Sequence, residues 1–134
     1  MKKIINLLVC LLLLTAPLSA QTDCDRLFAP IAETLRKTDV VAFSNYFAEA
    51  VECTILGEGQ TYSKEQARQV IRNFFTVNGE VRSYTIKHCS GKEYLKYAIG
   101  NLTTTNGTVY RVTLFASVDE GNKPKVRQLR IEKQ

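Results

Sequence analysis

Few side chains in this sequence could do proton-transfer chemistry, and the most distinctive is the single histidine, His88. If residues 80–89 form a strand, alternation of side chains places His88 on the same face as Tyr84 and sends Cys89 to the opposite face. A tyrosine and a histidine on one face can act as general acid and base on a bound molecule. Tyr84 and His88 are therefore the candidate pair for an enzymatic function.

Carboxylates, which proton-transferring enzymes commonly hold in a pocket, occupy unfavourable positions in this sequence. In the C-terminal half, each one falls at the end of an expected strand or in a turn. These residues are Glu80, Glu93, Asp119, Glu120 and Glu132. Glu52 is the only other acid in an expected strand. We therefore expect no catalytic residue and favour a non-enzymatic protein.

Tyrosines are a more promising resource for binding than for catalysis. Tyr84 and Tyr97 fall on neighbouring expected strands, close in sequence to His88. Tyrosine combines a large apolar surface with a polar tip, which suits a small and mostly apolar ligand. Tyr84, His88 and Tyr97 are the candidate ligand-binding residues. The alternative interpretation is that the tyrosines simply fill the core.

The cysteines do not indicate a metal site. Cys24, Cys53 and Cys89 allow at most one disulfide within the chain, and the sequence does not choose among the three pairings. Their spacing, with one histidine, does not match that of zinc sites. The sequence also lacks a glycine-rich phosphate loop, so we expect no cofactor. A further alternative is that all three cysteines are buried as small apolar residues.

The N-terminus has the pattern of a secretory signal peptide. Lys2 and Lys3 precede an apolar run over residues 7–14, and small residues end at Ala20, where we expect cleavage. This run is much shorter than the roughly 20 residues that a membrane-spanning helix needs. We therefore expect a signal peptide over residues 1–20, then a single domain over residues 21–134. The mature protein would be exported to the periplasm or beyond, without a membrane span.

The charge is mildly basic. Removal of the signal peptide lowers the net charge from +5 to about +3, which is too small for a nucleic-acid binder. Five basic residues crowd the last expected strand and its approach: Lys123, Lys125, Arg127, Arg130 and Lys133. They can protect a sheet edge from unwanted pairing, or they can attract an acidic partner.

Three helices are expected in the N-terminal half. The first begins at Pro30, because proline is favoured at the first helical position. Asp39 caps a second short helix that extends to Phe47. The third helix has the clearest signals, because Ser63 and Gln66 form a capping box and apolar residues follow at helical spacing.

Strands make up the rest of the expected fold. They lie at residues 51–56, near 61–62, and then at 80–89, 93–104, 108–118 and 124–132. Residues 57–59, 90–91, 106–107 and 121–124 are the expected turns, and Asn106-Gly107 is the strongest hairpin signal. Such short connections make neighbouring strands antiparallel. We predict an α+β fold with three N-terminal helices packed on a curved antiparallel sheet.

This order of elements resembles the nuclear transport factor 2-like superfamily, also described as cystatin-like, in which a curved sheet wraps helices into a cone. Local stretches also resemble a family of uncharacterised bacterial secreted proteins in that superfamily. The stretches are Tyr62 to Ala67, Asn73 to Phe75, Lys87-His88, Tyr97 to Gly100, Leu102 to Thr104, Asn106-Gly107 and Gln128 to Glu132. The resemblance implies the cone fold but no particular activity.

The leading hypothesis is an exported binding module whose cone pocket or sheet face holds a small apolar ligand or a partner protein. The competing hypothesis is an isomerase- or dehydratase-type enzyme that uses Tyr84 and His88. The lack of a mid-strand aspartate departs from the isomerase-like members of the superfamily and counts against this second hypothesis. A homodimer formed through the sheet is a third hypothesis.

Overall fold

The computed structural model describes residues 23–134, so the expected signal peptide, residues 1–20, lies outside the described residues. The described helices are α2 (Asp23–Arg36), α3 (Val40–Ser44) and α4 (Lys64–Asn78). The strands are β1 (Phe47–Ile55), β2 (Glu58–Ser63), β3 (Val81–Lys92), β4 (Leu95–Thr104), β5 (Val109–Val118) and β6 (Pro124–Lys133). The α+β class is confirmed.

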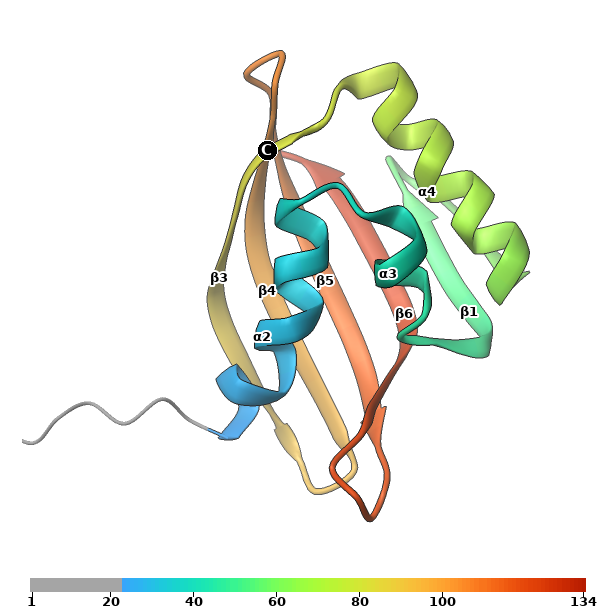
Figure 1. The fold of residues 1–134 in the computed structure, drawn as a ribbon, viewed down its shortest axis with the longest axis vertical. Helices are drawn as coiled ribbons and strands as arrows, with labels where there is room; N and C mark the ends of the chain where they lie inside the picture. The colour runs from blue at the N-terminus through green and yellow to red at the C-terminus, as the bar shows by residue number, and fades with distance from the viewer. Residues whose placement is uncertain (1–22) are drawn as a thin grey trace, which may run out of the picture.

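The six strands form one curved sheet in the order β2-β1-β6-β5-β4-β3 (Figure 1). The β1–β2 hairpin and the β3–β6 meander are antiparallel as expected, but β1 and β6 pair in parallel. This non-local pairing places β6 inside the sheet. The basic residues of β6 therefore do not protect a sheet edge, as one interpretation of the sequence held, and a different reason for them is needed.

The helices lie on one side of the sheet (Figure 1). Helix α2 contacts β3 and β4, whereas α4 contacts β1 and β2, and the short α3 packs against both helices. Their buried side chains join those of the strands in a single hydrophobic core. The opposite face of the sheet, here called the outer face, has no helix of the described chain against it.

Helix α4 begins as the sequence predicts. The Ser63 hydroxyl accepts a hydrogen bond from the Gln66 backbone N–H at 3.2 Å, and the Gln66 side chain accepts one from the Ser63 N–H at 3.0 Å. These two bonds satisfy N–H groups that have no partner within the helix. The buried face of α4 carries Ala67, Ile71, Phe74 and Phe75.

Helix α2 starts seven residues before Pro30, so the prediction that Pro30 opens the helix was wrong. Cys24 and Phe28 are buried on the same face as Ile31 and Leu35, and this burial extends the helix towards the N-terminus. Pro30 is exposed, and it leaves one carbonyl of the preceding turn without a helical N–H partner.

Helix α3 is capped by Asp39, whose carboxylate accepts a hydrogen bond from Ala42 N–H at 3.1 Å, as expected. The helix ends at Ser44, and Phe47 opens β1 instead of closing the helix as predicted. Phe47 still packs edge-on against Phe43, with ring centroids 5.0 Å apart. The prediction that Phe47 belongs to the second helix was therefore wrong.

Two of the expected turns differ in outcome. Asn106-Gly107 forms the predicted turn, and Gly107 has a φ of +88°. Ser90-Gly91 does not, because it lies within β3, and the chain turns instead between Lys92 and Leu95. Gly91 is needed for a close approach, since a Cβ there would lie 2.3 Å from the Leu95 carbonyl oxygen.

Side chains fill the concave side of the sheet. The largest fully buried ones are Tyr84, Phe28, Phe43, Phe47, Ile31, Ile71, Leu102, Leu114, Leu129, Val51, Val112 and Val126. Among residues 23–134, none of the helices has the length and apolar character needed to cross a membrane.

Candidate functional site

Tyr84 belongs to the packed core and not to an accessible pocket. Its side chain is 1% exposed, and its ring lies over Gly100, where a Cβ would be 2.7 Å from the ring. Among residues 23–134 the hydroxyl has no hydrogen-bond partner. Burial raises the pKa of the Tyr84 phenol far above its ordinary value, and the charge of Arg36 opposes this only in part. Tyr84 therefore stays neutral and is shielded from solutes.

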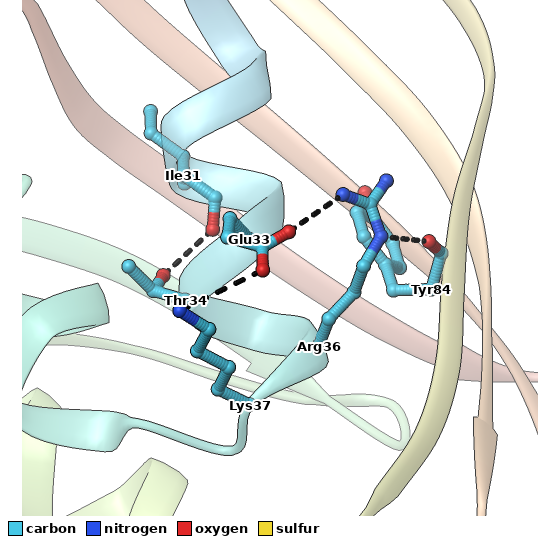
Figure 2. A network of polar contacts seen from close by, with 6 residues as sticks. All are labelled: Ile31, Glu33, Thr34, Arg36, Lys37 and Tyr84. Carbon is cyan, nitrogen blue, oxygen red and sulfur yellow. Dashed lines mark hydrogen bonds and ion pairs between the residues drawn. The ribbon is translucent and has the colours of Figure 1, made fainter.

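A small polar network fixes the end of α2 to β3 beside Tyr84 (Figure 2). Arg36 Nε donates a hydrogen bond to the Tyr84 backbone carbonyl at 2.8 Å. Arg36 and Lys37 also pair with the Glu33 carboxylate, at 3.3 and 3.7 Å. The ion pairs are half exposed and contribute little, so the network has a positioning role and offers no catalytic group.

His88 lies on the outer face, so the expectation that it shares a face with Tyr84 was wrong. The β3–β4 register shifts between Ile86 and His88, which marks a bulge. A bulge adds a residue on one strand and reverses the alternation beyond it. Cys89 accordingly faces the helices, opposite to His88 as predicted.

Cys89 forms a disulfide with Cys24 of α2, with their Cα atoms 5.9 Å apart. This pairing joins the first turn of α2 to β3 and leaves Cys53 as the free cysteine of the three. Burial raises the pKa of the Cys53 thiol to about 11. The Cys53 thiol is therefore neutral at physiological pH and a poor nucleophile.

Two of the candidate ligand-binding residues lie together on the outer face. His88 Nε2 lies within hydrogen-bond distance of the Tyr97 hydroxyl, at 3.1 Å. The Tyr97 ring also contacts Phe115 of β5, with centroids 5.9 Å apart. Of the three candidate ligand-binding residues, the structure thus brings His88 and Tyr97 together and leaves Tyr84 on the other side of the sheet.

These rings belong to a larger apolar surface, here called the outer patch and defined as Leu95, Tyr97, Ile99 and Phe115. Alternation along β4 aligns its first three members, and Phe115 lies directly opposite Tyr97 on β5. Leu95 is 57% exposed, and the other three side chains are half-buried. The sequence indicated Tyr97 as a candidate ligand-binding residue, but it did not indicate that Tyr97 and its apolar neighbours lie on this face.

Basic side chains border the outer patch on the β6 side. Arg130 pairs with Thr113, the residue opposite Ile99, and Lys125 lies opposite Ser117. Arg127 is the extra residue of a bulge and donates a hydrogen bond to Ser117 at 2.8 Å. The basic side chains of β6 therefore lie along one border of the outer patch.

A groove of about 370 Å³ separates α4 from the β1–β2 hairpin. Its lining residues are Cys53, Ile55, Leu56, Glu58, Tyr62, Val70, Asn73, Phe74, Val77 and Asn78. The groove was not expected from the sequence. Val77, which continues the Val70 and Phe74 spacing of α4, is the signal that could have indicated it. Within the described chain, no three histidine, cysteine or acidic side chains meet as metal ligands.

The fold is that of the nuclear transport factor 2-like proteins. An NTF2-like protein from Cytophaga hutchinsonii matches with a TM-score of 0.58 at 10% identity, covering 87% of this chain and 95% of that one. A cystatin-like protein from Nostoc punctiforme matches with a TM-score of 0.62 at 17% identity, covering 81% and 86%.

The chain belongs to the DUF4783 family, described as a domain of unknown function, whose model matches residues 28–132. A family protein from Bacteroides ovatus has a TM-score of 0.72 and 26% identity, covering 79% of this chain and 94% of that chain. One from Bacteroides fragilis has a TM-score of 0.71 and 27% identity, covering 78% and 96%. No curated protein matches.

Proposed function

We propose that this protein is an exported, non-enzymatic interaction module that binds a partner protein through its outer patch. The observation that carries the proposal is the aligned apolar strip of Leu95, Tyr97, Ile99 and Phe115 on a face that no described helix covers. Contiguous exposed apolar surface on a small protein is typical of an interaction site. Tyrosine in particular is enriched among residues that dominate binding energy.

The concave side is a less suitable place for a ligand. In this proposal the buried side chains of the three helices pack against the concave side, and Tyr84 is one of the residues of that packed core. A hollow cone with converging polar groups would have favoured a small apolar ligand there. The separation of Tyr84 from His88 also removes the acid-base pair of an isomerase or dehydratase.

The charges around the outer patch indicate the chemistry of the partner. Lys125, Arg127 and Arg130 lie along one side. Two acids lie near them: Glu132, 3.7 Å from Arg130, and Glu52, which lines a small hollow with Phe115 and Arg130. A partner surface with an apolar centre and an acidic rim complements this arrangement. Export is supported by the Cys24–Cys89 disulfide, since such bonds persist in oxidising compartments.

A photocrosslinking experiment tests the proposal. Benzoylphenylalanine in place of Ser90, an exposed residue of β3 opposite Tyr97, should form one defined adduct in cells. The same photoreactive residue in place of Gln69, which is exposed on α4, should form no such adduct. Tyr97→Ser should reduce the adduct by about 30-fold, as expected for a residue central to an interface. Tyr94→Ser, which removes a 65% exposed tyrosine outside the outer patch, is the matched control.

Equal adducts at positions 69 and 90, or an adduct that survives Tyr97→Ser, would contradict the proposal. An adduct with the mass of two copies, together with dimers in sedimentation, would identify the partner as a second copy and support the homodimer hypothesis. Loss of a turnover on His88→Ala would instead favour the enzyme hypothesis.

A further inference from the structure

The groove between α4 and the β1–β2 hairpin has apolar walls that extend from the hydrophobic core to the surface. On the helix side, Val70, Phe74 and Val77 follow one another at spacings of four and three residues, so they share a face. On the hairpin side lie Ile55 and Leu56. Val77 is 71% exposed and Leu56 is 50% exposed, which leaves apolar surface in water on both sides of the groove.

Cys53, whose side chain is 1% exposed, also lines the groove. Its neutral thiol adds to the apolar character of the lining. At about 370 Å³ the groove lies at the small end of the roughly 300–1,000 Å³ over which ligand pockets are found. The space therefore suits a small molecule with a compact apolar body.

Except for Asn78, whose side-chain amide is hydrogen-bonded, the polar side chains of the groove have no partner within residues 23–134. Glu58, Tyr62 and Asn73 make no side-chain hydrogen bond or ion pair there. Glu58 lies opposite Ile55 in the hairpin register, so its side chain is on the same face as that apolar wall. Glu58 is also the only charged residue of the lining, which contains no lysine or arginine.

We propose that this groove binds a small organic cation, an amine with an apolar body. The apolar part lies between α4 and the hairpin, and the ammonium group donates a charge-assisted hydrogen bond to the Glu58 carboxylate. An anion of the same shape is repelled by Glu58 and finds no basic side chain in the lining. This site is separate from the outer patch and does not depend on it.

Three probes with one apolar body and different charge test the inference. They are 4-phenylbutylamine, 4-phenylbutanol and 4-phenylbutyrate, titrated into the purified disulfide-bonded protein and followed by amide NMR shifts. The amine should bind about five-fold more tightly than the alcohol, and the carboxylate should bind most weakly. The shifts should map to Leu56, Glu58, Tyr62 and Val77, and the amine should slow alkylation of Cys53.

Two variants separate the charge from the apolar contact. Glu58→Gln should lower the affinity for the amine to that for the alcohol, whereas Val77→Ser should weaken the amine and the alcohol alike, by about five-fold. Both sites are exposed, so neither change should unfold the protein. Glu52→Gln is the control, because Glu52 lies on the same hairpin but bonds Gln128 instead of lining the groove.

Three results would overturn the inference. One is equal affinity for the amine and the carboxylate. Another is unchanged amine affinity in Glu58→Gln. The third is absence of groove shifts with any probe at 10 mM, which would leave the groove as a contact surface for a protein segment or as unused surface.

Discussion

Removal of the Cys24–Cys89 disulfide should cost this protein a large part of its stability. The two cysteines are 65 residues apart, and a closed loop of that length restricts the unfolded chain by an amount worth about 4 kcal/mol at 25 °C. Domains of this size are typically stable by only about 5–15 kcal/mol. The bond also fixes the first turn of α2 to β3, so its loss frees the helix segment before Pro30.

Urea unfolding of the double variant Cys24→Ala/Cys89→Ala measures this cost. The midpoint should fall by about 2–3 M, given the usual dependence of stability on urea. Cys53→Ala is the control, because it removes a buried thiol without opening a disulfide and should cost only about 1 kcal/mol. A double variant within 1 kcal/mol of the parent, or peptide mapping that finds Cys53 in a disulfide, would refute the reasoning.

The other predictions concern individual buried or capping groups. Tyr84→Phe removes an unpaired buried hydroxyl and should stabilise by about 1 kcal/mol in urea unfolding, whereas Tyr110→Phe breaks a 3.2 Å bond to Asn78 and should destabilise by a similar amount; the reverse order would contradict the assignment. Ser63→Ala should cost about 1 kcal/mol, and no change would mean that the cap is not formed in solution. The Cys53 thiol ionises near pH 9 unfolded but near pH 11 folded, so stability should be unaffected below pH 9 and fall between pH 9 and 11. Cys53→Ala should remove that fall in a pH series, and an identical fall in both proteins would be inconsistent with the burial of this thiol.

Short sequence motifs correctly predicted the helix caps and the turn that depend only on contacts between residues close in the chain. The capping box at Ser63 and Gln66, the cap at Asp39 and the turn at Asn106-Gly107 all rest on contacts within a few residues, and all three are confirmed. The start of α2 was missed because Pro30 was treated as a boundary. The burial of Cys24 and Phe28, at helical spacing from Ile31 and Leu35, was the signal that could have corrected it.

The candidate site could not be predicted in the same way. Nothing in the residues around Ile86 and His88 marks the bulge that places His88 on the outer face. The parallel pairing of β1 with β6 joins strands far apart in the chain, and it decides that the basic residues of β6 lie inside the sheet. The side-chain types indicated which residues could contact a ligand or partner, but the strand register determines which face of the sheet each of them occupies.

Hydroxyl-radical footprinting of the outer patch, in cells and on the purified protein, tests the proposed interaction most directly. Tyr97 and Phe115 should be oxidised readily in the purified protein and at least several-fold more slowly in cells, where the partner covers them. Tyr94, exposed in the adjoining turn, provides the internal reference. Equal oxidation of Tyr97 and Phe115 in both samples, relative to Tyr94, would show that nothing binds this face and would contradict the account.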